Sequence, residues 1–589
     1  MTLATLVQSE VCWHRPISVM LCAAVLFEMV LESYVAIFRK NRYLANLYRN
    51  LTESDDQTYC RLIGAGGEIH LTRRDVAQAA GGYGKAYREA DLRQNDLVLI
   101  FLKHVPDLYG SFFGAMLSGV IPSFMPCVSA RQDPKLYWSS HAELLRRIRP
   151  AAIVAARDTF ADMQASGLLF DDTALIETES VAPADLALVV RDEDNIALLQ
   201  HSSGTTGLKK GVALSFRAVA DQIERYAAAL EISETDRIVH WLPLYHDMGL
   251  IACAVLPAYL GVPTVHIDPL HWVSQPGLLL EAIAKHRGTL TWMPNFAFEH
   301  LVNICGSAAA SYDLSSMRAF INCSETCKPR AFHRFEDTFA PSGVAPRQLH
   351  CCYAMAETVF AVSQTPLVRP PERIRVESSS LERGETIRRI DNGGIELLET
   401  GTPIRDMEVS ILDEKAMPLP EDTVGEVALS APFVFSGYYK DPERTAKRLR
   451  DGVYRTGDLG FVHNEKLYVL GRTDDLIIVN GRNIYAHQVE AAISEVEGLK
   501  PGRSVAVPVF DERVGSEVLI VMAERRRESE RLDSAIQADV LRIVQSVFNV
   551  LPRKVRIVDE GWLIKTTSGK ISRTENLKKF RSETKGVPA

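Results

Sequence analysis

The feature that most constrains the fold is a series of short apolar runs in the first part of the chain. Each run has the length of a buried strand and is followed by a helical pattern or by a Gly, Pro or Asn signal. Repeated alternation of this kind, with continuously apolar strands, predicts a layered α/β fold with mainly parallel sheets. The runs are DLVLIFL (96–102), AAIVAA (151–156), NIALLQH (195–201), RIVHWLPL (237–244), GTLTWM (288–293) and MRAFIN (317–322).

The chain has 589 residues, too many for one hydrophobic core, so we expect several domains. Past Arg375, the short alternating strands MEVSILD, GEVALSA and KLYVLGR predict a smaller β-rich subdomain. Beyond residues 471–475 the pattern predicts a compact α+β unit. We therefore expect an N-terminal extension (1–40), a large domain (41–473) and a small C-terminal domain (474–589).

The N-terminal run ISVMLCAAVLF (17–27) is the most apolar part of the extension. No small-residue cleavage site follows it, and Glu28 and Glu32 interrupt a membrane span. We expect an amphipathic or buried helix and no integral membrane span, with weak membrane-surface association as the alternative.

Charge and cysteine content narrow the class of protein. The formal net charge of −8 gives no general attraction to nucleic acid, so no nucleic-acid partner is expected. The 10 cysteines lack paired metal-ligand spacing, which predicts reduced thiols in a cytoplasmic enzyme.

The loop QHSSGTTGLKKGV (200–212) has the composition of a phosphate-binding loop. Its glycines allow close backbone approach, and its hydroxyl and amide groups donate hydrogen bonds. Neither lysine follows the second Gly that a Walker loop requires, so that motif is excluded. The loop follows NIALLQH and is expected at the carboxyl end of a parallel strand. Taken alone, a Ser/Gly-rich surface turn would fit it as well.

Four more motifs follow this loop in order: YAMAET (353–358), YRTGDLG (454–460), GRTDDLIIVNGRNIY (471–485) and KTTSGKISR (565–573). Together the five resemble the signature motifs of the adenylate-forming superfamily. The resemblance implies that ATP and a carboxylic acid give an acyl-adenylate and pyrophosphate. The acyl group then passes to a thiol.

The resemblance also implies roles for individual residues. Lys570 matches the lysine that bridges carboxylate and phosphate, Glu357 the magnesium ligand, and Asp474 the hinge about which the C-terminal domain moves. Asp458 and Arg472 match the ribose-binding pair, and His246 matches the residue that gates the acyl tunnel. The expected cofactors are ATP and Mg²⁺, with Thr206 as a second magnesium ligand. The remaining nucleotide-binding residues implied by the motifs are Ser203, Gly204, Thr205, Thr206, Gly207, Lys210, Ser324, Glu325 and Tyr353.

WLPLYHDMGLI (241–251) and GRNIY (481–485) resemble the fatty acyl-AMP ligase branch. That branch implies a fatty acid substrate and the phosphopantetheine thiol of an acyl carrier protein as acceptor. The alternatives are an acyl-CoA synthetase that uses coenzyme A and, more remotely, a weakly catalytic acyl or nucleotide sensor. Departures from the family pattern add bulk or freedom near the nucleotide and predict atypical affinity or turnover. They are Lys209, Cys323, Thr326 and Ala354.

Overall fold

The fold is described from a computed structural model. The predicted helix at 17–27 lies outside the described residues. These are residue 37 and residues 39–54, 56–128, 134–168, 172–202, 210–473, 476–479, 482–511, 516–548, 550–565 and 571–584.

The largest sheet has nine strands in the order β17-β14-β13-β12-β11-β9-β10-β1-β2. Its interior pairs, from β13 to β1, are parallel, and its edge pairs are antiparallel. Three of the predicted apolar runs supply β9, β11 and β12. The strands are β1 (Thr58–Gly64), β2 (Gly67–Thr72), β9 (Ile238–His240), β10 (Thr264–Ile267), β11 (Leu290–Met293), β12 (Ala319–Asn322), β13 (Leu349–Ala354), β14 (Ala361–Gln364) and β17 (Thr402–Pro403).

A second sheet, β4-β3-β5-β6, is parallel throughout. Helix α5 (Asp107–Ser118) connects β3 to β4 and ends at Gly119, whose φ of 91° is the left-handed conformation that glycine adopts readily. The predicted layered α/β fold is confirmed. The strands are β3 (Leu97–Phe101), β4 (Ile121–Phe124), β5 (Ala152–Ala155) and β6 (Ala174–Glu177).

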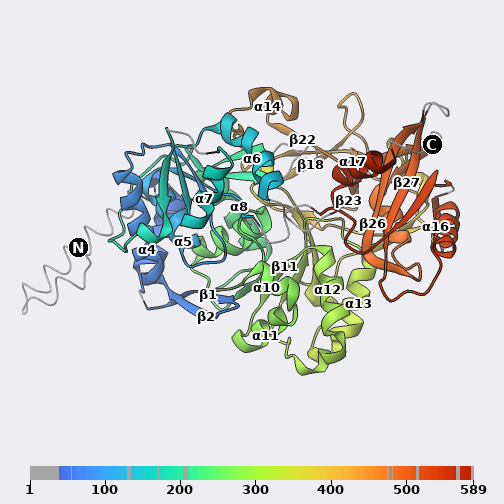
Figure 1. Cartoon of the computed structure of the whole chain (residues 1–589), viewed down its shortest axis with the longest axis horizontal. Coiled ribbons are helices and arrows are strands. Elements are labelled where there is room, and N and C mark those ends of the chain that lie inside the picture. Colours follow the sequence, from blue (N-terminus) through green and yellow to red (C-terminus); the bar gives the residue numbers. More distant parts are fainter. Residues whose placement is uncertain are drawn as a thin grey trace, which may run out of the picture.

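Helices pack on these sheets, as Figure 1 shows. Helix α4 packs closely on α5, since a Cβ at Gly110 would lie 2.6 Å from the Cβ of Ala79. None of the helices within the described ranges is long and apolar enough to cross a membrane. The main helices of this part are α3 (Arg42–Thr52), α4 (Arg73–Glu89), α6 (Pro134–Ile148), α7 (Arg157–Ala165), α8 (Phe216–Ala229), α11 (Gly277–His286), α12 (Asn295–Cys305) and α13 (Pro329–Phe339).

The predicted direction of the strand before the phosphate loop is wrong. Strand β7 (Ile196–Ser202) pairs antiparallel with β8 (Lys210–Ser215), which pairs antiparallel with β20 (Gly437–Tyr438). An apolar run indicates that both faces of a strand are buried, but it does not indicate the direction of the neighbouring strands. This three-stranded sheet is buried as a parallel sheet would be, so its strands carry the same pattern.

The β-rich subdomain predicted after Arg375 is confirmed as an antiparallel sheet in the order β18-β19-β22-β21, with β23 also paired to β22. A two-stranded sheet, β15-β16, accompanies it. The strands are β15 (Arg373–Val376), β16 (Ile395–Leu398), β18 (Glu408–Leu412), β19 (Gly425–Ser430), β21 (Leu449–Arg450), β22 (Val453–His463) and β23 (Lys466–Arg472).

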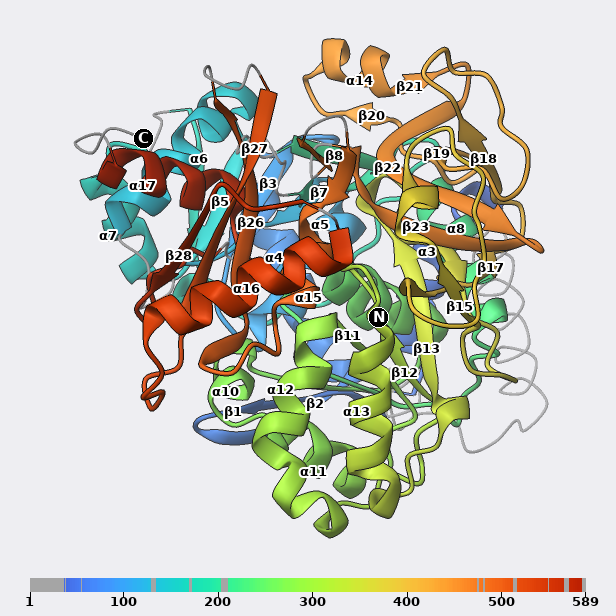
Figure 2. The same cartoon turned by 90° about the vertical axis from the view of Figure 1, so that its right-hand side faces the viewer.

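The C-terminal part folds as a mixed sheet with helices, in agreement with the predicted α+β class. Figure 1 shows its strands in orange and red at the right-hand end, and Figure 2 shows α16 lying across them. Its core contains Ile477, Val521 and Val540. The elements are β24 (Leu476–Val479), β25 (Arg482–Tyr485), α15 (Ala486–Ala492), β26 (Leu499–Asp511), β27 (Ser516–Arg525), α16 (Asp533–Phe548), β28 (Lys554–Val558) and α17 (Arg573–Thr584).

Candidate active site

Glu357 is the centre of a buried polar cluster formed by three separate segments. It lies in a short 3₁₀ turn (Ala356–Thr358) after β13, and only 5% of the residue is exposed. Lys210 Nζ at the start of β8 is 2.7 Å from Glu357 Oε1. The hydroxyl of Tyr438 on β20 donates to the same oxygen at 2.8 Å and accepts from Lys210 Nζ at 3.1 Å. The fold thus brings two residues of separate motifs into direct contact.

The charge state of this cluster follows from its contacts. Burial by itself raises the pKa of Glu357, but the charge of Lys210 and the hydrogen bonds from Lys210 and Tyr438 outweigh it and lower that pKa. The carboxylate is therefore ionised at neutral pH. Burial and the nearby Glu357 charge raise the pKa of Tyr438, so its phenol keeps its proton and donates it.

A second polar cluster joins Tyr353, Asp458 and Arg472. The hydroxyl of Tyr353, at the end of β13, donates to Asp458 Oδ2. The pairing of β22 with β23 sets Asp458 opposite Arg472, whose Nε is 3.4 Å from Asp458 Oδ1. The Asp458 side chain is 10% exposed and that of Arg472 is 52% exposed, so this cluster reaches the surface.

The two clusters are contiguous. Tyr353 and Glu357 lie four residues apart on one segment, and Tyr454 and Asp458 lie on β22. The hydroxyls of Tyr454 and Tyr438 are 3.5 Å apart. Sequence reasoning missed Tyr438, because GYYK (437–440) carries no recognisable motif and its partner Glu357 is distant in the chain.

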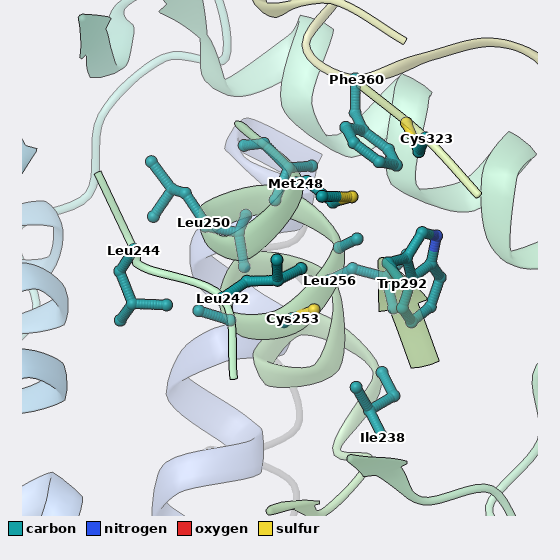
Figure 3. Packing of buried hydrophobic residues seen from close by; sticks show 14 of the residues in the cluster. Ile238, Leu242, Leu244, Met248, Leu250, Cys253, Leu256, Trp292, Cys323 and Phe360 are labelled. Atoms are coloured by element: carbon teal, nitrogen blue, oxygen red, sulfur yellow. The ribbon is translucent and has the colours of Figure 1, made fainter. Parts of the chain in front are cut away.

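The segment NCSET (322–326) follows β12 beside these clusters. Ser324 has a φ of 72°, which a non-glycine residue rarely adopts, and its hydroxyl is 3.9 Å from the sulfur of Met248. Glu325 Oε2 accepts from the backbone N–H of Phe296 at 3.4 Å. Cys323 is fully buried in the apolar core and lies near Phe360 (Figure 3).

His246 lies directly before a buried apolar helix. Its carbonyl accepts from the Leu250 N–H at 2.7 Å, where the chain enters a buried π-helix, η2 (Met248–Val255). Gly249 is required there, because a Cβ would lie 2.3 Å from the carbonyl oxygen of Pro243. Figure 3 shows Leu250 on the side of this helix that carries Leu242 and Leu244, whereas Trp292 lies on its other side. π-Helical segments occur frequently at functional sites.

Aromatic rings flank this region. Trp241 and Trp272 stack with centroids 3.6 Å apart, and Phe296 lies 5.9 Å from Trp241. Phe298, by contrast, is fully buried between Phe332 and Phe335 and is a core residue.

Arg573, the last residue of KTTSGKISR, is fixed to the C-terminal unit. Its Nε and Nη2 atoms lie 3.1 and 2.8 Å from the two carboxylate oxygens of Glu490 on α15. Burial raises the pKa of Glu490, although the Arg573 charge opposes that shift. This bidentate pair anchors the end of the segment that contains Lys570. Several predicted site residues lie outside the described residues, namely Ser203, Gly204, Thr205, Thr206, Gly207, Asp474 and Lys570.

Comparisons with known proteins identify the family of the chain. The family model described as "AMP-binding enzyme" matches residues 49–439. The long-chain-fatty-acid–AMP ligase FadD32 of Mycolicibacterium smegmatis is 28% identical over 540 residues, covering 81% of this chain and 84% of that protein. The 4-hydroxyphenylalkanoate adenylyltransferase of Mycobacterium tuberculosis is 30% identical over 414 residues, covering 66% of each chain.

Solved structures share the fold. One, from studies of fatty acyl-adenylate ligases of E. coli and L. pneumophila, has a TM-score of 0.84 at 23% identity, covering 93% of this chain and 98% of that one. A fatty acyl-adenylate ligase of L. pneumophila in complex with acyl adenylate and pyrophosphate has a TM-score of 0.70 at 23% identity, covering 91% and 96%.

Proposed function

The chain belongs to the AMP-binding enzyme family, and we propose that it activates a fatty or other carboxylic acid with ATP and then passes the acyl group to a carrier-protein thiol. One observation carries the proposal: an ionised Glu357 beside Lys210 adjoins the Asp458–Tyr353–Arg472 cluster. A phosphate-binding site and a ribose-binding site in direct contact are what an adenylating enzyme requires.

On this proposal Asp458 accepts hydrogen bonds from the ribose hydroxyls, and Arg472 and Tyr353 hold the carboxylate in place. Ser324 and Glu325 lie on the adenine side. Lys210, with the loop residues Ser203, Gly204, Thr205, Thr206 and Gly207, cradles the phosphates.

Glu357 suits a magnesium ligand, because it is a buried carboxylate held ionised beside the phosphate side of the site. Mg²⁺ is usually held by one or two carboxylates together with substrate phosphates. Glu357 and Thr206 would hold it, and the ion would supply countercharge to the phosphate oxygens.

The chemical step is in-line displacement at the α-phosphorus. A carboxylate oxygen of the acid attacks, the bond from the α-phosphorus to the bridging oxygen breaks, and pyrophosphate leaves. Lys570 places positive charge between the two anions as they approach, where such charge stabilises the transition state most. In the second step the thiol attacks the acyl carbon and AMP leaves.

The acyl chain is proposed to enter past His246, which lies directly before the buried η2 segment. We also propose the division into residues 41–473 and 474–589, with Asp474 as the hinge that lets the C-terminal domain present Lys570. A cytoplasmic location fits the ATP requirement and the eight free cysteines within the described ranges.

The test is carboxylate-dependent exchange of pyrophosphate into ATP across a panel of acids of increasing chain length. Exchange that requires a fatty acid supports the proposal, and absence of exchange with every acid refutes it. Holo carrier protein and coenzyme A, offered separately with the preferred acid, then decide between the carrier-dependent ligase and the acyl-CoA synthetase.

The role of Lys570 has its own test. Lys570→Ala is expected to abolish exchange with little loss of stability, whereas Lys578→Ala, at an exposed lysine of the same region, leaves exchange unchanged. Wild-type exchange by the Lys570→Ala variant would contradict the role.

A further inference from the structure

A pocket of about 260 Å³ on the β-rich subdomain contains an unusual excess of positive charge. Four cationic side chains and a single carboxylate line it. The residues are Arg383, Lys447, Arg448, Arg455 and Glu426, with Thr473 at its edge.

The one carboxylate is already engaged. Glu426 Oε2 accepts from Arg455, with Nε at 3.1 Å, and Oε1 accepts from the Gly457 N–H at 3.2 Å. The Nη1 atom of Arg448 is 3.9 Å from Glu426 Oε1, so its attraction to this carboxylate is much weaker. The charge of one arginine is therefore compensated and the rest of the pocket stays strongly positive.

Arg383 and Lys447 have no carboxylate partner among the described residues. The Nε and Nη2 atoms of Arg383 are buried, and neither meets a hydrogen-bond acceptor in that part of the chain. Buried guanidinium N–H groups are costly to leave without acceptors, so their arrangement favours an anionic ligand.

The backbone is shaped to hold Arg448 in this pocket. Gly457 has a φ of 78°, and a Cβ there would lie 2.7 Å from Arg448 Nη1. With no side chain at Gly457, the end of the Arg448 side chain lies against the strand without having to shift. The Thr473 hydroxyl donates to the Gly457 carbonyl at 3.0 Å, which ties this strand to the end of β23.

The pocket lies on the opposite face of β22 from the candidate active site. Tyr454 and Asp458 reach Tyr438 and Tyr353 on one face, whereas Arg455 reaches Glu426 on the other. The apolar neighbours agree, because Tyr454 packs in the main core and Leu459 in a separate cluster. The pocket is therefore distinct from the nucleotide-binding clusters, although both share one strand.

We propose that this pocket binds the phosphate group of a ligand during the reaction. Arginine guanidinium groups match phosphate oxygens in bidentate geometry, and the positive pocket complements a phosphate dianion. The proposed function supplies two sources of such a group, released pyrophosphate and the phosphate in the pantetheine arm of the acceptor. The choice of these two ligands rests on the proposed function, whereas the anion-binding character of the pocket does not.

The test is equilibrium binding by titration calorimetry with two probes, pyrophosphate and pantetheine 4′-phosphate. The protein is compared as wild type, as the Arg383→Gln/Lys447→Gln double variant, and as Arg450→Gln. Arg450 is a matched control, because it is an exposed arginine close by in the sequence that does not line the pocket. Lys447→Gln alone changes only an exposed side chain, so it tests the pocket even if the double variant does not fold.

We expect at least one probe to bind the double variant about tenfold more weakly, or worse, as the loss of charge-assisted hydrogen bonds predicts. Lys447→Gln should give a smaller loss in the same direction, and Arg450→Gln should bind within about twofold of wild type. Loss confined to pyrophosphate identifies a product subsite, and loss confined to pantetheine 4′-phosphate identifies an acceptor subsite.

Equal binding by all four proteins, or failure of both probes to bind wild type, overturns the proposal. Pyrophosphate exchange is measured on the same samples. If exchange is absent but the probes bind and the variants weaken that binding, the proposed function is refuted and the pocket assignment stands. If exchange is present but the variants do not change binding of the probes, the pocket assignment is refuted and the proposed function stands.

Discussion

Two buried polar regions of the large domain solve the same physical problem in opposite ways. In the cluster of Glu357, Lys210 and Tyr438, charged groups are retained and compensate each other at hydrogen-bond distance. In a stack of three histidines, His104, His240 and His266, the groups are kept neutral. Burial of the charged cluster requires oppositely charged partners, whereas burial of the histidines requires that their rings stay unprotonated.

The histidine stack is packed as aromatic rings. His240 on β9 and His266 on β10 stack with centroids 4.2 Å apart, and His104 meets His266 edge-on at 4.4 Å. Neither ring nitrogen of His240 has a hydrogen-bond partner within the described residues. Burial, together with the smaller effect of His104, lowers the pKa of His240 to about 3. Burial and the neighbouring His240 and His104 lower the pKa of His266 well below its usual value.

The largest expected effect, summed over the buried histidines, separates the two regions by pH. Because the folded-state pKa values of His240 and His266 are depressed, their unprotonated forms are favoured in the fold. Stability is then full above the unfolded pKa of about 6.5 and is lost as pH falls below it. From pH 7.5 to 5 we expect each histidine to cost up to about 2 kcal/mol.

The measurement is the thermal unfolding midpoint between pH 5 and 8. His240→Met should remove one histidine's share of the acid loss, up to about 2 kcal/mol, whereas His70→Gln, at an exposed histidine, should leave the profile unchanged. An acid profile of His240→Met identical to that of wild type would show that the stack is not the source. Glu357 does not contribute in this range, since its lowered pKa confines its loss of stability to more acidic pH.

The next effect removes compensation from the charged region. Lys210→Ala leaves Glu357 as a buried carboxylate without its cation, a change that costs about 3 kcal/mol or more. Lys210 also faces the proposed phosphate site, so pyrophosphate exchange should fall together with the unfolding midpoint. The matched control is Lys440→Ala, at a nearby lysine that donates to the Ile148 carbonyl and is not part of this cluster. An unchanged unfolding midpoint in Lys210→Ala would mean that Glu357 is not held by that charge.

The sequence predicts these two regions unequally. Glu357 and Lys210 belong to motifs that resemble a known family, so both could be named before the fold was seen. His240 lies inside the run 237–244, whereas His266 lies on β10, which none of the runs contains. Nothing in a run reveals that β9 and β10 are neighbours. Strand positions could be predicted because the apolar pattern of a buried strand is visible within a few consecutive residues. Pairing could not be predicted, because partners such as Tyr438 come from distant segments. The predicted direction of β7 was wrong for this reason, since its pairing partner β8 cannot be read from the run itself.

A smaller effect tests the hydroxyl that completes the charged cluster. Tyr438→Phe removes a donor to Glu357 and an acceptor from Lys210 while keeping the ring, and we expect a loss of about 2 kcal/mol because both bonds involve charged groups. Tyr439→Phe, at the adjacent tyrosine, is the control. Thermal unfolding of both variants measures the difference. Equal midpoints would show that the Glu357–Lys210 pair needs no third member.

The smallest expected effect completes the comparison from the neutral side. At pH 8, His240→Met should cost less than about 1.5 kcal/mol, because it replaces a neutral, unbonded ring by an apolar side chain of similar volume. Glu357→Met is the matched change in the charged cluster, and it should destabilise more strongly, since it leaves Lys210 without its carboxylate. Chemical denaturation at pH 8 gives both values. If His240→Met proved as costly as Glu357→Met, the histidine stack would have to be held by specific hydrogen bonds, and neutrality alone would not explain its burial.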